Sequence, residues 1–147
     1  MKDVVMSSKN IFSYMEIAKL WSKNSYAKRA KVGCIIVKDN MIISDGYNGM
    51  PSGLNNNCEI ELNGEYHTRH EVIHAESNAI CKLAKSTQSS SGACLFTTMA
   101  PCYEGAKLII QSEINCVYYL EEYKSPEGLD LLSKVKIKTI QLTKATC

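Results

Sequence analysis

Apolar residues at helical spacing mark the first regular element of the chain. Ile11, Met15 and Ala18 recur three or four positions apart, and further apolar residues beside them widen the stripe into a broad face. This spacing predicts an amphipathic helix over residues 11–22. Apolar residues recur at the same spacing over residues 74–85 and predict a second helix there.

Short blocks of β-branched and other apolar residues predict the strands. Residues 32–38 form the strongest block, and Asp39-Asn40 is a turn signal that leads into a return strand over residues 41–44. Later in the chain, predicted strands and helices alternate. The strands cover residues 93–97, 116–120 and 135–142, and the helices cover residues 101–112 and 127–133.

This order of elements defines the expected fold class. A hairpin comes first, and strand–helix–strand crossovers of this length then favour parallel neighbours covered by helices. We therefore expect an α/β protein, a three-layer α/β/α sandwich with a mixed five-strand sheet. The length of 147 residues suits a single domain over residues 1–147.

Residues 45–73 form the least regular stretch of the pattern. They include several glycines, a proline and three consecutive asparagines. A loop of this length in a compact domain is usually functional or disordered. The chemistry-bearing side chains in this stretch favour a function, and they are Cys58, Glu59, His67, His70 and Glu71.

Composition and charge narrow the function classes. The chain has 17 Lys and Arg against 15 Asp and Glu, and this net charge of +2 argues against a protein whose main task is to neutralise a nucleic-acid backbone. No apolar run approaches the roughly 18 residues that span a bilayer, and the first residues lack the apolar segment of a signal peptide. We therefore expect a cytoplasmic protein with no membrane partner. Its seven cysteines would stay reduced there, and some could bind metal.

The strongest chemical signal comes from two short segments at predicted helix starts. His74-Ala75-Glu76 opens one helix, and Pro101-Cys102 opens another, where Pro101 takes the first-turn position that proline tolerates. A helix N-terminus favours a thiolate at Cys102, His74 offers a nitrogen to the same metal ion, and Glu76 is placed to shuttle protons. Each pattern is weak by itself. In this order, they match the arrangement of zinc nucleobase deaminases.

On the basis of these residues, the sequence resembles the deoxycytidylate (dCMP) deaminase family of the cytidine deaminase superfamily. The similarity extends over roughly residues 11–142, and the Gly-Tyr-Asn-Gly stretch separates this family from other members of the superfamily. The fold that the resemblance implies agrees with the predicted elements. The matching stretches are Lys31-Val32-Gly33, Gly46-Tyr47-Asn48-Gly49-Met50-Pro51-Ser52-Gly53, His74-Ala75-Glu76-Ser77-Asn78-Ala79-Ile80, Pro101-Cys102 and Ala106-Lys107-Leu108-Ile109-Ile110-Gln111.

The resemblance implies a zinc-dependent hydrolysis of dCMP to dUMP. His74 and Cys102 would bind the zinc, which would lower the pKa of a bound water toward about 7. Glu76 would take the proton of that water, and hydroxide would attack C4 of the cytosine. Glu76 would then pass protons to N3 and to the departing ammonia.

The resemblance also implies how the nucleotide would be held. Asn48 would hold the sugar, and Tyr123 resembles the aromatic residue that packs on the base. The phosphate would meet Arg29, Lys31 or Lys124, and the sequence leaves the choice among these three open.

Members of the family are commonly homo-oligomers, often hexamers, and are often regulated by dCTP and dTTP near the Gly-Tyr-Asn-Gly loop. The resemblance implies both properties here. The main alternative is a catalytically degenerate protein that serves as a nucleotide-binding or assembly subunit. An RNA or DNA base deaminase of the same superfamily is disfavoured, because strand binding needs a basic groove.

One position departs from the family pattern. The family has a second cysteine three residues after Cys102, on the same helix face, but this chain has Gly105. A catalytic zinc normally has three protein ligands, so its affinity should fall if only His74 and Cys102 hold it together with solvent. Alternatively another residue supplies the third ligand, with Cys34 the best candidate and Glu104 a poorer one. The third hypothesis is an inactive site.

A second zinc site in the long loop is a further hypothesis. Some relatives bind a structural zinc there, and the candidate ligands in this chain are Cys58, His67, His70 and Glu71. A small loop rich in Gly and Asn buries little surface and would gain stability from a metal. Those relatives also have a cysteine before the Val-Gly pair, whereas residues 26–28 here contain none. The alternative is that the two histidines are solvated.

Overall fold

The computed structural model describes residues 6–143, and a five-stranded sheet forms its centre. The strand order is β2-β1-β5-β6-β7. β1 runs antiparallel to both of its neighbours, whereas β5, β6 and β7 run parallel, so the sheet is mixed as expected. The strands are β1 (Gly33–Lys38), β2 (Met41–Tyr47), β5 (Cys94–Met99), β6 (Cys116–Glu121) and β7 (Lys138–Gln141).

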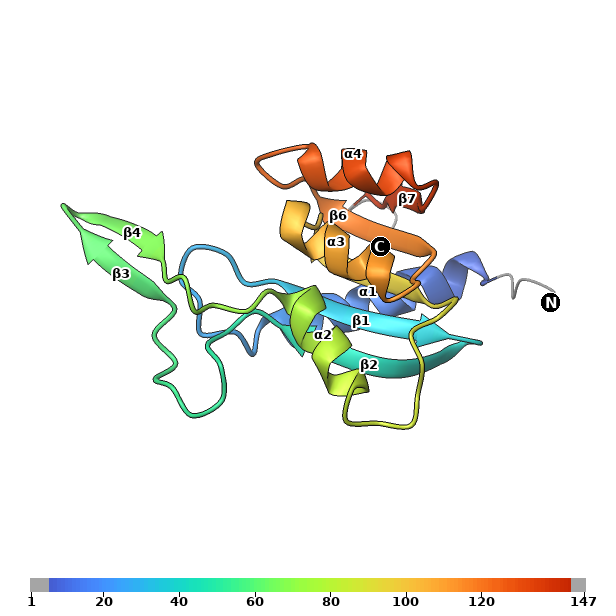
Figure 1. Cartoon of the computed structure of the whole chain (residues 1–147), viewed down its shortest axis with the longest axis horizontal. Helices are drawn as coiled ribbons and strands as arrows, with labels where there is room; N and C mark the ends of the chain where they lie inside the picture. Colours follow the sequence, from blue (N-terminus) through green and yellow to red (C-terminus); the bar gives the residue numbers. More distant parts are fainter. Residues whose placement is uncertain (1–5, 144–147) are drawn as a thin grey trace.

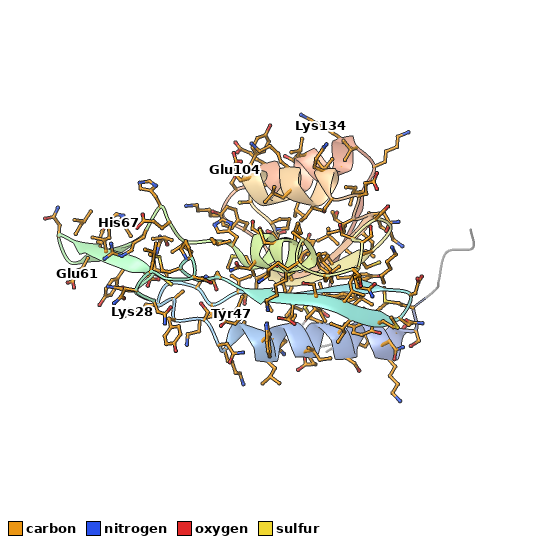
Figure 2. The ribbon with its side chains drawn as sticks, turned by 60° about the horizontal axis from the view of Figure 1, so that its bottom comes forward. Lys28, Tyr47, Glu61, His67, Glu104 and Lys134 are labelled. Atoms are coloured by element: carbon orange, nitrogen blue, oxygen red, sulfur yellow. The ribbon has the colours of Figure 1, made fainter. Side chains whose placement is uncertain are left out.

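Helices cover both faces of this sheet. One face packs against α1 (Ser8–Ser22), and the other packs against α2 (Ala75–Leu83), α3 (Tyr103–Gln111) and α4 (Glu127–Lys134). Figure 2 shows α1 on one side of the sheet and the later helices on the opposite side. The predicted three-layer α/β/α sandwich with a mixed five-strand sheet is therefore confirmed.

The two hydrophobic cores follow from the side-chain alternation of β1. Cys34 and Ile36 belong to the core that contains residues of α2, α3 and α4, whereas Ile35 and Val37 belong to the core beneath α1. All four side chains are buried, as expected for a central strand covered on both faces.

A glycine on β2 lets α2 approach the sheet closely. A Cβ atom at Gly46 would lie 2.4 Å from the carbonyl oxygen of Ala75 and 2.7 Å from the backbone nitrogen of Ala79, so any larger residue would collide with the helix backbone. The Ser44 hydroxyl donates a hydrogen bond to the carbonyl oxygen of Ala79 at 2.6 Å. These contacts fix the N-terminal half of α2 against the sheet.

The stretch 45–73 is more regular than the sequence pattern predicts. β2 continues into it, and β3 (Glu59–Leu62) pairs with β4 (Glu65–Thr68) in a separate antiparallel hairpin. Figure 1 shows this hairpin projecting from the body of the protein. Asn63 and Gly64 form its turn with φ angles of 53° and 80°. The expectation of an irregular loop throughout is therefore wrong, and Asn-Gly, a strong hairpin signal, could have revealed the turn.

The two chemically important helices begin slightly later than the pattern predicts. His74 and Cys102 are the N-caps of α2 and α3 rather than residues of their first turns. Pro101 therefore precedes the N-cap of α3, and its predicted place in the first turn is wrong. Both N-caps lie at the positive ends of their helix dipoles, where negative charge is favoured.

Within residues 6–143, no helix has both the length and the apolar character needed to cross a bilayer. The cytoplasmic location and the single domain over residues 1–147 stay predictions from the sequence.

Candidate active site

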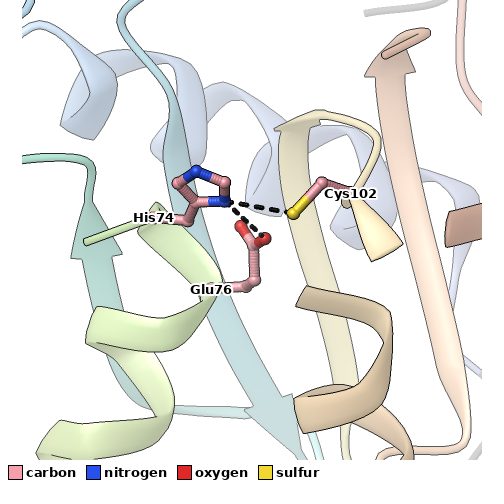
Figure 3. Close-up of side chains that lie close together, drawn as sticks. All are labelled: His74, Glu76 and Cys102. Atoms are coloured by element: carbon pink, nitrogen blue, oxygen red, sulfur yellow. Dashed lines mark hydrogen bonds and ion pairs between the residues drawn. The ribbon is translucent and has the colours of Figure 1, made fainter. Parts of the chain in front are cut away.

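The starts of α2 and α3 bring two potential metal ligands together. Both helices lie on the same face of the sheet, and α3 follows directly after β5. The Nδ1 atom of His74 lies 3.3 Å from the Sγ atom of Cys102. Figure 3 shows the imidazole and the thiol facing each other across the gap between the two helix starts.

Glu76 completes a cluster of three at this point. Its Oε1 atom lies 3.8 Å from Nδ1 of His74, and the residue is only 3% exposed. One ligand atom each from His74, Glu76 and Cys102 lie within 4.8 Å of one another. Among residues 6–143, no other group of three His, Cys, Asp or Glu residues meets this criterion for holding a metal ion.

Electrostatics favour charged side chains in this cluster. The hydrogen bond to Cys102, followed by that to Glu76, raises the pKa of His74 to about 10. Burial opposes ionisation of Cys102, but hydrogen bonds from His74 and from the Gly105 N–H outweigh it, so the pKa of the thiol is lowered. A metal ion must therefore displace the proton of His74 when it binds, because a protonated imidazole cannot be a ligand.

The donor set fits a zinc ion. Zinc binds histidine nitrogen at about 2.0–2.1 Å, cysteine sulfur at about 2.3 Å and carboxylate oxygen at about 2.0–2.2 Å, which puts tetrahedral ligand atoms about 3.4–3.6 Å apart. The His74–Cys102 distance of 3.3 Å and the His74–Glu76 distance of 3.8 Å lie within a few tenths of an ångström of these values. The cluster thus holds a zinc-compatible nitrogen, sulfur and oxygen.

Gly105 lies directly beside the carboxylate of Glu76. The glycine is buried in α3, and a Cβ atom on it would lie 2.2 Å from Oε1 of Glu76. Glu76 therefore occupies the space that a side chain at position 105 would need.

The two substitute ligands suggested by the sequence do not join the cluster. Cys34 is fully buried in β1, and burial, with the nearby charge of Glu76, raises the pKa of its thiol well above the usual range. Glu104 is exposed and pairs with Lys107 at 2.7 Å, and Figure 2 shows it on the outside of the protein. Neither residue belongs to the three-residue group.

A pocket of about 340 Å³ opens in front of the cluster. It is in the size range of small-molecule sites. Of the residues predicted to contact a nucleotide, Asn48, Tyr123, Arg29 and Lys124 line this pocket. Lys31 is exposed and is not among the lining residues, so the structure narrows the cationic candidates to Arg29 and Lys124.

Asn48 and Tyr123 both line this pocket. The Asn48 amide accepts a hydrogen bond from the Val32 N–H at 2.9 Å and donates one to the Ala30 carbonyl at 2.8 Å, so it braces the segment before β1. Burial, followed by the nearby charges of Cys102 and Glu76, raises the pKa of Tyr123. The phenol ring therefore lies near the cluster.

Glu59 is a pocket residue whose role the sequence did not reveal. Its Oε2 atom accepts hydrogen bonds from the backbone N–H groups of Lys28 at 2.8 Å and Arg29 at 3.0 Å. Its buried Oε1 atom has no hydrogen-bond partner among the residues that the structure describes. The carboxylate thus ties the segment before β1 to the pocket wall. No motif marks it, because its position depends on how the loop folds back.

The structure places the four candidate ligands for a second zinc in different surroundings. Cys58 is buried in the wall of the same pocket. His67 lies on the projecting hairpin, where its nearest acidic partner is Glu65 at 3.8 Å (Figure 2). His70 and Glu71 are exposed. Within the described part of the chain these residues form no metal-binding group of three, so the geometry gives the second site no support.

Comparison with known proteins identifies the family. Residues 8–121 match the family described as the cytidine and deoxycytidylate deaminase zinc-binding region, and the chain belongs to it. Zinc is therefore the metal for which this cluster is built, as the sequence predicts.

Relatives within this family carry deoxycytidylate deaminase names. A probable deoxycytidylate deaminase of Caenorhabditis elegans is 37% identical over 111 residues, which cover 74% of this chain and 55% of the nematode protein. The human deoxycytidylate deaminase is 34% identical over 117 residues, with 74% of this chain and 63% of that protein covered. The chain thus spans 55% and 63% of the lengths of these two relatives.

A solved structure matches over nearly the whole chain. The dCMP deaminase of the cyanophage S-TIM5, crystallised in complex with dCMP and dUMP, is 40% identical and superimposes with a TM-score of 0.89. The match covers 94% of this chain and 100% of the phage chain.

Proposed function

We propose that this protein catalyses the zinc-dependent hydrolysis of dCMP to dUMP and ammonia. The observation that carries the proposal is the position of the His74–Glu76–Cys102 cluster in the wall of a nucleotide-sized pocket. The 40% identity to a phage enzyme crystallised with dCMP and dUMP supports the choice of substrate.

The reaction assigns separate tasks to the residues of this cluster. His74 and Cys102 would hold the zinc ion, which would supply the Lewis acidity for hydrolysis. Glu76 accepts a proton from the attacking water and returns protons to N3 of the base and to the leaving amine. Because Glu76 is nearly excluded from solvent, its proton is transferred within the site rather than lost to bulk water.

The rest of the pocket would orient the nucleotide. Tyr123 lies near the cluster and offers its ring to the cytosine. Asn48 offers its side-chain amide to the sugar. Arg29 and Lys124 supply positive charge for the phosphate, which arginine recognises well because its planar guanidinium donates paired hydrogen bonds.

Activity of the zinc-loaded protein tests the proposal. We expect equal amounts of dUMP and ammonia from dCMP, loss of turnover after treatment with a chelator, and recovery on addition of Zn²⁺. Chromatography of the nucleotides together with an ammonia assay measures both products. Zinc-saturated protein that binds dCMP but releases no dUMP would instead identify a non-catalytic nucleotide-binding subunit.

Replacing Arg29 tests how the phosphate is held. We expect Arg29→Ala to raise KM for dCMP roughly 10- to 100-fold with a much smaller change in kcat, because a charged hydrogen bond contributes about 1.5–3 kcal/mol and the phosphate lies away from the reacting atoms. Lys31→Ala is the matched control, since it removes a neighbouring cation outside the pocket. Steady-state kinetics of both variants measure these changes. An equal rise in KM for Arg29→Ala and Lys31→Ala would contradict the assignment of Arg29 to the phosphate.

Assembly and regulation extend the same proposal. Family membership supports a homo-oligomer, a hexamer in many members, with dCTP and dTTP as effectors. A second pocket of about 360 Å³ lies along the Gly-Tyr-Asn-Gly stretch and supports an effector site, with Tyr47, Gly49, Met50 and Pro51 among its lining residues.

A further inference from the structure

We propose that Glu76 itself supplies the third protein ligand to the metal, in place of the thiolate that is absent at position 105. This inference deepens the proposed function and rests on it for the presence of zinc. It gives one carboxylate two tasks, metal binding and proton transfer.

The first observation is the placement of the carboxylate. Glu76 extends from the first turn of α2 to within 3.8 Å of the His74 nitrogen that also contacts Cys102. The three donor atoms lie within 4.8 Å of one another. Figure 3 shows the carboxylate beneath the imidazole and beside the thiol.

The second observation is the space that Gly105 leaves. A Cβ atom at this position would lie 2.2 Å from Oε1, 3.1 Å from Cδ and 3.3 Å from Cγ of Glu76. The whole end of the glutamate thus packs against the bare glycine backbone. A side chain at residue 105 would collide with the Glu76 carboxylate where it now lies. The carboxylate can therefore take this place only because residue 105 has no side chain.

The third observation is the charge of the donor set. Cysteine thiolate and glutamate carboxylate each bring one negative charge, so the exchange leaves the total charge of the three protein ligands unchanged. Catalytic zinc sites with three protein ligands use carboxylate oxygen as well as cysteine sulfur. The other residues considered for this role, Cys34 and Glu104, lie outside the cluster.

Ligation does not remove Glu76 from proton transfer. A carboxylate has two oxygens, and ligation through one of them leaves the second as a proton acceptor. The same residue can therefore hold the metal and serve as the base that the reaction requires.

Metal affinity of three variants tests the inference. Metal-free protein is titrated with Zn²⁺ against a chromogenic chelator. We expect Glu76→Gln to weaken binding at least about 30-fold, because a neutral amide is a poor zinc ligand, and Gly105→Ala to do the same, because its methyl group displaces the carboxylate. Glu104→Gln, a neighbouring exposed carboxylate, should leave the affinity unchanged.

The double variant and the spectrum of bound Co²⁺ complete the test. Gly105→Ala should add little further loss in the Glu76→Gln background, since both changes remove the same ligand. In the same Glu76→Gln background, Gly105→Cys should restore zinc affinity. The Co²⁺ complex of this double variant should show stronger sulfur-to-metal charge transfer than that of the wild-type protein, because one thiolate becomes two. Circular dichroism of the metal-free variants checks that each is folded.

The outcomes separate this inference from the proposed function. Wild-type zinc affinity in Glu76→Gln would overturn the inference and leave the metal to His74, Cys102 and solvent, whatever the activity. Loss of affinity in Glu76→Gln and Gly105→Ala would support the inference even if the zinc-loaded wild-type protein failed to deaminate dCMP. Turnover of dCMP by the wild-type protein bears on the function and not on the ligand.

Discussion

Replacement of Cys102 by alanine is expected to lower zinc affinity roughly 10²- to 10³-fold and to reduce dCMP turnover to background at micromolar zinc. Four-ligand zinc sites gain about 10–16 kcal/mol on binding, so one ligand accounts on average for about 2.5–4 kcal/mol. Cys102 contributes more than an average ligand here. Its thiol is the only one in the cluster of three described above, and the hydrogen bonds of His74 and of the Gly105 N–H stabilise the thiolate.

Zinc titration and dCMP kinetics measure this effect side by side. Cys81→Ala is the control, because Cys81 lies on α2 as an exposed free thiol that takes no part in the cluster. If Cys102→Ala kept both zinc and turnover, the metal would lie elsewhere and the assignment of the site would fail.

Replacement of Gly46 by alanine is expected to destabilise the protein by about 2–4 kcal/mol. The added methyl group would meet the carbonyl oxygen of Ala75 at 2.4 Å and the nitrogen of Ala79 at 2.7 Å. These are backbone atoms, which cannot rotate aside, so α2 must move away from the sheet. His74 and Glu76 move with the helix start, and zinc affinity should fall together with stability.

Thermal and urea unfolding of the metal-free protein measure this second effect. A loss of this size corresponds to a fall in Tm of about 4–16 °C for a domain of this length. Gly49→Ala is the matched control from the same stretch, because a Cβ atom there meets nothing within 4 Å, and its stability should change by less than about 0.5 kcal/mol. Equal stability of Gly46→Ala and the wild type would show that α2 is free to shift.

The layered fold could be predicted because its elements carry strong local patterns. The β-branched block of β1 and the helical spacing of α2 each reflect burial against another layer, and burial determines residue type. The hairpin of β3 and β4 lacks that signal. All four residues of β4 are exposed, so neither face of the hairpin needed an apolar pattern. The sequence signal for the hairpin lay in its turn residues, Asn63 and Gly64.

The part of the candidate site that depends on short sequence motifs could be predicted. His74, Glu76 and Cys102 occupy fixed positions at two helix starts, and the sequence order of these residues indicates metal chemistry. The contact of Glu76 with Gly105 could not be predicted, because it depends on the packing of α2 against α3. The same limit applies to Lys31, which lies close to Arg29 in sequence and yet falls outside the pocket.

The close approach of Gly105 to Glu76 also bears on how such a site can change during evolution. In the proposed reaction glutamate transfers protons whichever side chain completes the metal site, so it would already be in place when position 105 mutates. With Glu76 as the third ligand, a single substitution between cysteine and glycine would exchange one anionic ligand for another. Such an exchange would need no compensating second mutation.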